Sequence, residues 1–124
     1  MAHAYPTLGI GSYDEAMPFY LEFLGFRVDF EHRRDAGSPV YMGISRGVSP
    51  GIDRGFLALH LTEHAVPLGA AVLLDVERVH DLYHDLRAKD PALAAELVDK
   101  PWGKSELHLH DPFGNHLTFT SPTP

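Results

Sequence analysis

The chain has 124 residues, of which 44% are hydrophobic, and its formal net charge is −7. This length suits one domain with one core, and the acidic balance argues against a nucleic-acid partner while it favours cationic ligands. The absence of cysteine excludes disulfides and thiol chemistry. There is no apolar run of about 18 residues that would span a membrane, and the N-terminal residues lack a secretion signal, so we expect a cytoplasmic protein.

A strand and a capped helix are predicted at the start of the chain. Alternation predicts a strand over Tyr5–Gly11, and Ser12 with Glu15 forms a capping box in front of a helix. Pro18 is expected to delay or bend this helix, and Gly25 is expected to end it. One apolar stripe at helical spacing predicts its buried face: Met17, Tyr20, Leu21 and Leu24.

Three more strands are predicted in the first half of the chain, over Arg27–Arg34, Val40–Arg46 and Phe56–Thr62. Alternation places Phe30 on the same face of the first of these strands as Phe26 and Val28, and it places His60 on the polar face of the last. A glycine- and proline-containing loop is predicted over Gly47–Gly55.

The second half then repeats the plan of the first. It begins with a predicted strand over Gly69–Val76, and a helix follows whose apolar positions have the same spacing as in the first helix: Val79, Leu82, Tyr83 and Leu86. A strand around Leu97–Lys100 and a final hairpin complete a second β-α-β-β-β unit. The repeat predicts an α+β fold of two such modules, one over residues 4–64 and one over residues 68–121, within a single domain.

The final hairpin spans Pro101–Thr120 and turns at Asp111-Pro112-Phe113-Gly114-Asn115. Its apolar residues alternate with a polar face rich in histidine and threonine: His108, His110, His116, Thr118 and Thr120. Two interpretations remain open for this face. It is either the lining of a ligand cleft or a solvated sheet face that happens to be rich in histidine.

A family resemblance rests on Trp102-Gly103, on the segment Glu106–Asn115 and on Leu117–Phe119. Together with the internal repeat, they resemble the vicinal-oxygen-chelate superfamily, which contains glyoxalase I, extradiol dioxygenases and bleomycin-resistance proteins. The resemblance covers nearly the whole chain. It implies a curled mixed sheet with the helices on its convex side and a cleft between opposed modules. In the bleomycin-resistance branch it also implies a homodimer, with first-strand exchange and clefts between subunits.

Catalytic members of this superfamily hold a divalent metal with residues from four strands. The resemblance places those four positions at Tyr5, His60, Ala71 and Thr118, and His60 alone among them is a good ligand for such a cation. We therefore expect no cofactor and a dismantled metal centre. An improvised metal site drawn from His60, His108, His110 and His116 remains the weaker alternative to neutral histidines that line a polar cleft.

Our leading hypothesis is a protein that binds and sequesters a small cationic or aromatic molecule, in the manner of bleomycin-resistance proteins and without catalysis. We expect this protein to have no nucleic-acid partner and no membrane partner. Its expected ligand contacts are Tyr5, Tyr41, His60, Trp102, His108, His110 and Thr118. The alternative is a metal-dependent lyase, isomerase or dioxygenase of the same fold with a non-standard metal site. A third hypothesis is a stress or regulatory protein with an unknown target.

Overall fold

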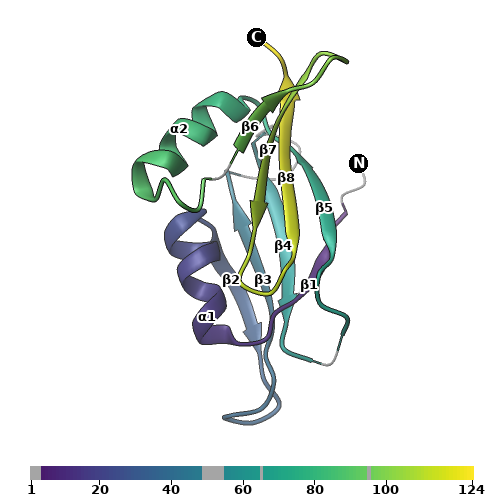
Figure 1. Ribbon diagram of the computed structural model, residues 1–124. Coiled ribbons are helices and arrows are strands. Elements are labelled where there is room, and N and C mark those ends of the chain that lie inside the picture. Colours follow the sequence, from purple (N-terminus) through teal and green to yellow (C-terminus); the bar gives the residue numbers. More distant parts are fainter. Residues whose placement is uncertain (1–3, 49–54, 65, 95) are drawn as a thin grey trace.

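The computed structural model describes residues 4–48, 55–64, 66–94 and 96–124 (Figure 1). The first half contains β1 (Thr7–Gly9), α1 (Tyr13–Met17), η1 (Pro18–Phe23), β2 (Arg27–His32), β3 (Tyr41–Arg46) and β4 (Leu57–Thr62). The second half contains β5 (Ala71–Asp75), α2 (Val79–Lys89), β6 (Glu96–Asp99), β7 (Lys104–His110) and β8 (His116–Pro122). Most of the loop predicted over Gly47–Gly55 lies outside the described residues. Within the described residues, no helix has the length and apolar character needed to cross a bilayer.

The strands form two four-stranded mixed sheets of the same design. Their orders are β1-β4-β3-β2 and β5-β8-β7-β6, and in each sheet the first strand runs parallel to its neighbour while the other pairs are antiparallel. This arrangement confirms the predicted α+β class with two β-α-β-β-β units. The described strands form two separate sheets, where the resemblance suggested one curled sheet.

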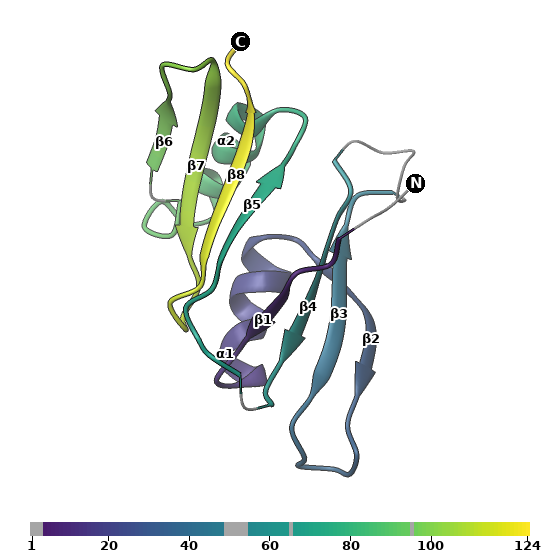
Figure 2. The same cartoon turned by 90° about the vertical axis from the view of Figure 1, so that its right-hand side faces the viewer.

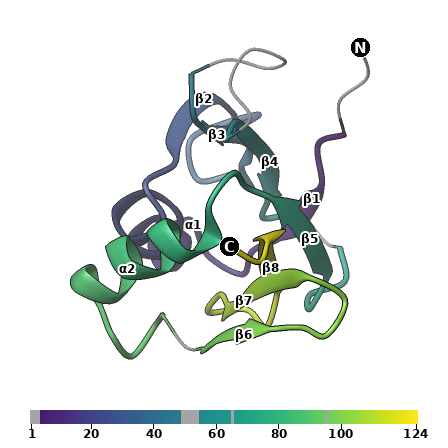
Figure 3. The same cartoon turned by 90° about the horizontal axis from the view of Figure 1, so that it is seen from above.

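Both helical segments lie on one side of the sheets. In Figure 2 the strands of each half lie in front of the helix that covers them, and Figure 3 shows α1 and α2 together on one side of the molecule. The apolar faces of both sheets and the buried faces of the helices form one continuous core cluster. Burial of this shared surface is the main force that holds the two halves together.

The first helix changes its winding at Pro18. Ser12 Oγ accepts the Glu15 N–H at 3.3 Å, which confirms the Ser12 half of the predicted capping box. Pro18 has no N–H to continue the α-helical pattern, and η1 is a π-helix in which the Leu24 N–H bonds Phe19 O, five residues back, at 2.9 Å. The predicted stripe is therefore wrong in part, since Met17 and Leu21 are only half-buried. The buried face consists of Ala16, Phe19, Tyr20, Phe23 and Leu24.

A β-bulge in β2 corrects the predicted position of Phe30. Val28 pairs with Ile44 and Phe30 pairs with Gly43, so Asp29 is left as an extra residue in the ladder. The extra residue turns Phe30 to the sheet face opposite to that of Val28. There its ring fills the space above Gly43, where a Cβ atom would lie 2.9 Å from Phe30 Cδ1.

The second helix follows the sequence prediction closely. Val79, Leu82 and Leu86 are buried and Tyr83 is half-buried. At its C-terminal end, Lys89 Nζ donates to the carbonyl oxygens of Glu22 and Phe23, at 3.2 and 3.0 Å. These are free carbonyls at the end of η1, so one lysine of the second half caps the first helical segment.

Candidate ligand-binding faces

The Asp111–Asn115 turn fixes the hairpin that carries most of the predicted site. Asp111 Oδ1 accepts the N–H groups of Phe113 and Asn115, at 2.9 and 2.8 Å. Its other oxygen accepts the Tyr20 hydroxyl from η1 at 2.6 Å. Burial, assisted by Asp111, raises the pKa of Tyr20, so the hydroxyl remains a donor at any physiological pH.

Asn115 connects this turn to the first module. Its Nδ2 donates to Gly9 O at 2.8 Å and to Asp111 Oδ2 at 2.7 Å, and its Oδ1 accepts the Ala70 N–H at 2.9 Å. Gly9 belongs to β1 and Ala70 directly precedes β5. The turn that carries the family resemblance is therefore a buried polar junction between the two halves of the fold.

Each sheet has one face that no helix covers, and we call these two surfaces the open faces. In Figure 2 both open faces are turned toward the viewer and lie side by side. The two modules of one chain therefore do not oppose their polar faces across a cleft. One hollow on the described part of the chain, of about 380 Å³, lies at one end of the second sheet and is lined by Asp75, Val76, Glu77, Lys104 and Pro122. Another lies between the hairpin turn and the first helical segment, and His110 is part of its lining.

The first open face centres on His60, which lies within a group of aromatic side chains. Tyr41 Oη is 2.7 Å from His60 Nδ1. The Tyr5 ring stacks on the imidazole at a centroid distance of 5.6 Å, and the Phe30 ring meets it edge-on at 5.4 Å. Tyr5 and Phe30 remain 47% and 44% exposed, so the aromatic group is open to a ligand. Sequence reasoning missed Phe30, because simple alternation cannot reveal a bulge.

The second open face carries a hydrogen-bonded chain of histidines. His108 Nε2 lies 3.0 Å from Glu106 Oε1, and His108 Nδ1 lies 2.8 Å from His116 Nε2. The ring of His110 stacks on that of His116 at a centroid distance of 4.5 Å. Burial, followed by the proximity of His110 and His108, lowers the pKa of His116. The neutral form of the His116 imidazole is therefore favoured.

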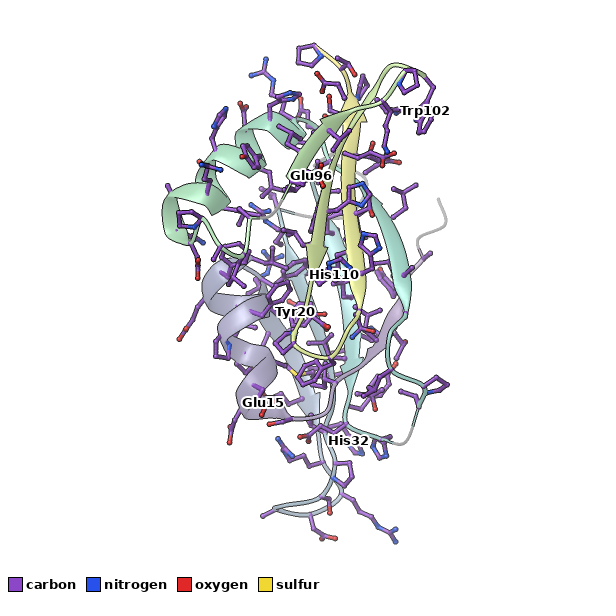
Figure 4. All side chains as sticks on the ribbon, in the orientation of Figure 1. Glu15, Tyr20, His32, Glu96, Trp102 and His110 are labelled. Atoms are coloured by element: carbon purple, nitrogen blue, oxygen red, sulfur yellow. The ribbon has the colours of Figure 1, made fainter. Side chains whose placement is uncertain are left out.

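The structure divides the predicted contacts into two groups and one outlier. Tyr5, Tyr41 and His60 lie together on the first open face. His108, His110 and Thr118 lie on the second. Trp102 lies in the turn between β6 and β7, at the opposite end of β7 from His110 (Figure 4). It is 66% exposed, and the Lys100 ammonium sits 5.7 Å from its ring centroid. Trp102 is not brought near the other predicted residues within one chain.

The four inherited metal positions do not fit a metal. Ala71 has no donor atom and Thr118 offers only a neutral hydroxyl, which leaves His60 as the one good ligand among the four. Tyr5, which precedes β1, and His60 on β4 belong to the first module, whereas Ala71 and Thr118 belong to the second sheet. No three or more His, Asp or Glu side chains converge as metal ligands in the part of the chain that the structure describes. His60 is also on a different sheet from the three hairpin histidines, so one chain does not assemble the improvised four-histidine site.

Comparison with known proteins agrees with this architecture. A family model described as "Glyoxalase superfamily protein" matches residues 1–123. No curated protein matches the chain. A glyoxalase-related enzyme from Clostridium phytofermentans is 19% identical, with a TM-score of 0.76 over 98% of this chain and 95% of that one.

Two similar structures are of proteins that bind bleomycin. A bleomycin-binding protein complexed with bleomycin is 23% identical, with a TM-score of 0.67 over 98% of both chains. The bleomycin-binding protein of bleomycin-producing Streptomyces verticillus, complexed with copper(II)-bleomycin, is also 23% identical, with a TM-score of 0.68 over 96% of this chain and 94% of that one. At such identities the likeness establishes the fold, and the function must be argued from the site. The family model, which spans nearly the whole sequence, shows that this chain belongs to the glyoxalase superfamily.

Proposed function

We propose that the chain binds a small cationic or aromatic molecule in the cytoplasm and sequesters it without transforming it, in a cleft shared by two copies of the chain. The observation that carries the proposal is the exposed aromatic group of Tyr5, Phe30 and Tyr41 around His60. Aromatic faces attract flat rings and cations. The net charge of −7 adds a longer-range attraction for cations.

The exposed apolar side chains on both open faces support a role for a second copy. Tyr5 and Phe30 are nearly half exposed on the first open face, and Leu73 is 68% exposed on the second. Exposed apolar surface of this kind marks contact sites. In a two-fold dimer, the first open face of each copy would meet the second open face of the other copy, so that all four open faces would be covered. It would also bring His60 and Tyr41 near the partner's hairpin, while β1 stays paired with its own β4 as it is here.

Catalysis is the weaker candidate. The two relatives that bind bleomycin and the enzyme relative share this fold, so the choice depends on the residues present. A lyase, isomerase or dioxygenase of the superfamily's type needs a metal between the modules. Ala71 provides no ligand and Thr118 only a neutral hydroxyl, so His60 is the one good ligand at these positions. Tight stoichiometric metal bound by residues of both modules, together with turnover, would establish the enzymatic alternative.

The proposal is tested by titrating the purified chain with bleomycin and with a panel of cationic and aromatic drugs, using calorimetry. We expect at least one compound to show saturable binding, with a stoichiometry of one ligand per chain. Phe30→Ala should weaken this binding by about tenfold or more, because an aromatic contact with a bound cation or ring contributes on the order of 1–2 kcal/mol. The matched control is Tyr83→Phe, on the half-buried surface of α2 and away from both open faces.

Sedimentation velocity supplies the second arm of the test. We expect a dimer at the concentrations used for binding. A strict monomer would refute the shared cleft. Equal affinity in Phe30→Ala and the wild-type protein would refute the assigned face, and failure of bleomycin alone would remove that compound while leaving the other ligands to decide.

A further inference from the structure

Three side-chain atoms converge on the second open face. His108 Nδ1 and His116 Nε2 are 2.8 Å apart, and Thr118 Oγ1 lies 3.3 Å from the first and 3.4 Å from the second. His108 and Thr118 are direct partners across β7 and β8, and His116 lies two residues before Thr118 on the same face. Two rigid neighbouring strands therefore hold these three atoms close together in a triangle. In the metal-free chain the 2.8 Å contact between the two imidazole nitrogens is a hydrogen bond, so one of them carries a proton that a cation would displace.

The two edges of the triangle that end at Thr118 Oγ1 match the spacing of about 3.4 Å between ligands of tetrahedral zinc, and the edge between the two nitrogens would have to lengthen from 2.8 Å when a cation enters. Zinc lies about 2.0–2.1 Å from imidazole nitrogen. A cation about 2.1 Å from each of the three atoms would stand about 1 Å above their plane, on the side away from the sheet. Such a position leaves its remaining coordination sites directed outward. Thr118 is buried, but the side chains of His108 and His116 are only half-buried, so a cation would reach this position from the solvent side of the two rings.

Glu106 orients the first imidazole as metal sites require. Its Oε1 lies 3.0 Å from His108 Nε2 and accepts the proton there, which leaves the lone pair on Nδ1 inside the triangle. The second imidazole is held by ring stacking, since His110 packs on His116 with an interplanar angle of 20°. Each of the two rings thus has a partner that fixes its orientation. A carboxylate behind a ligating histidine is a recurrent feature of metal centres.

We propose that His108, His116 and Thr118 form a binding site for a late first-row divalent cation, zinc or copper(II), with Glu106 as the orienting carboxylate. Imidazole nitrogens suit these two metals, and the two histidines supply most of the affinity while the hydroxyl is a weak neutral third ligand. The site differs from the superfamily's four-strand centre, with which it shares only Thr118. All its residues come from the second module, so it is complete in one chain. It does not depend on the proposed function, because the cation needs no organic ligand.

The test is calorimetric titration of the metal-free full chain with zinc alone, near neutral pH. We expect one zinc ion per chain in the wild-type protein and loss of that binding in His116→Asn. Glu106→Gln should weaken binding by about 10–100-fold, the usual effect of removing a carboxylate behind a ligating histidine. The matched control is the double variant His80→Asn/His84→Asn. Those two histidines of α2 lie one helical turn apart, a spacing that also suits chelation.

Histidine nitrogen-15 NMR identifies the ligating atoms. Zinc should shift the Nδ1 resonance of His108 and the Nε2 resonance of His116, while those of His84 stay in place. Each variant is first checked for a wild-type circular dichroism spectrum. If His116→Asn fails to fold, Glu106→Gln and the NMR shifts decide the question.

Three results would overturn the proposal. They are absence of zinc binding at millimolar concentration, unchanged affinity in folded His116→Asn, and loss of binding in the α2 double variant. Any of these leaves the binding of an organic ligand untouched, since zinc is the only probe.

Discussion

Replacing Asn115 by alanine should be among the most damaging single changes in this chain. The substitution removes three hydrogen bonds and leaves the Gly9 carbonyl and the Ala70 N–H without the partners they have now. Asn115 is only 1% exposed and Gly9 is buried, so water does not easily replace the lost amide. Each buried polar group left unpaired costs about 1–3 kcal/mol, so we expect a loss of about 3 kcal/mol in the free energy of unfolding.

That loss is a large fraction of a typical domain stability of about 5–15 kcal/mol. At about 4 °C per kcal/mol for a chain of this size, Tm should fall by about 12 °C. The assay is urea unfolding followed by far-UV circular dichroism, which reports both modules, whereas the exposed Trp102 would report poorly on the core. The matched control is Pro112→Ala in the same turn. Pro112 is exposed, and its replacement should cost at most about 1 kcal/mol through added freedom of the unfolded chain.

The reasoning would be refuted if Asn115→Ala cost no more than Pro112→Ala. Such a result would mean that the modules are held by apolar packing alone and that the amide bridge adds nothing. The slope m of the urea unfolding curve provides a second test. If the amide bridge couples the modules, the variant should show a smaller m value or two transitions, because the halves would then unfold separately.

The remaining predictions concern pH, a cross-module cap and the core. Burial alone would raise the pKa of Glu63, but the N–H groups of Val40 and Tyr13 and the guanidinium of Arg33 lower it overall. The stabilisation by ionised Glu63 is therefore complete above the unfolded pKa of 4.5 and disappears as the pH falls through the lower folded pKa. In Glu63→Gln, the urea midpoint should depend less on pH between pH 2 and 5 than it does in the wild-type protein. An unchanged pH dependence would contradict the assignment. Lys89→Ala uncaps η1 and should cost about 0.5–1 kcal/mol in chemical denaturation. Lys100→Ala, which removes a contact with the exposed ring of Trp102, should cost less. Leu86→Ala should cost about 2–5 kcal/mol in the same assay, and a loss below 1 kcal/mol would mean that α2 does not pack as described.

Local sequence signals were reliable where backbone chemistry or periodicity is decided by near neighbours. The Ser12 cap, the stop at Gly25 with its φ of +77°, and the apolar stripe of α2 all lie where the sequence predicted them. The same holds for the alternation of the hairpin, where Leu107, Leu109, Leu117 and Phe119 are fully buried. In these places a side chain and its neighbours along the same element carry enough information.

The candidate site was predictable in kind but not in arrangement. Alternation along the strands predicted that His60, His108 and Thr118 lie on the polar faces of their sheets, and the structure has them there, while their role as ligand contacts stays a prediction. Sequence reasoning could not find Phe30, since the bulge at Asp29 follows from the fit of β2 on β3. Nor could it place Trp102, whose loop has no register with the strands.

The sequence by itself determined the superfamily and the repeated β-α-β-β-β plan, because both depend on residue identity at fixed spacing. Only the tertiary structure decided that Asp111 and Asn115 join the two halves, that the open faces lie side by side, and that His108, His116 and Thr118 meet at one point. The physical reason is that these contacts depend on strand register and on how the two sheets share one core. Both are set by long-range packing, which a local pattern does not encode.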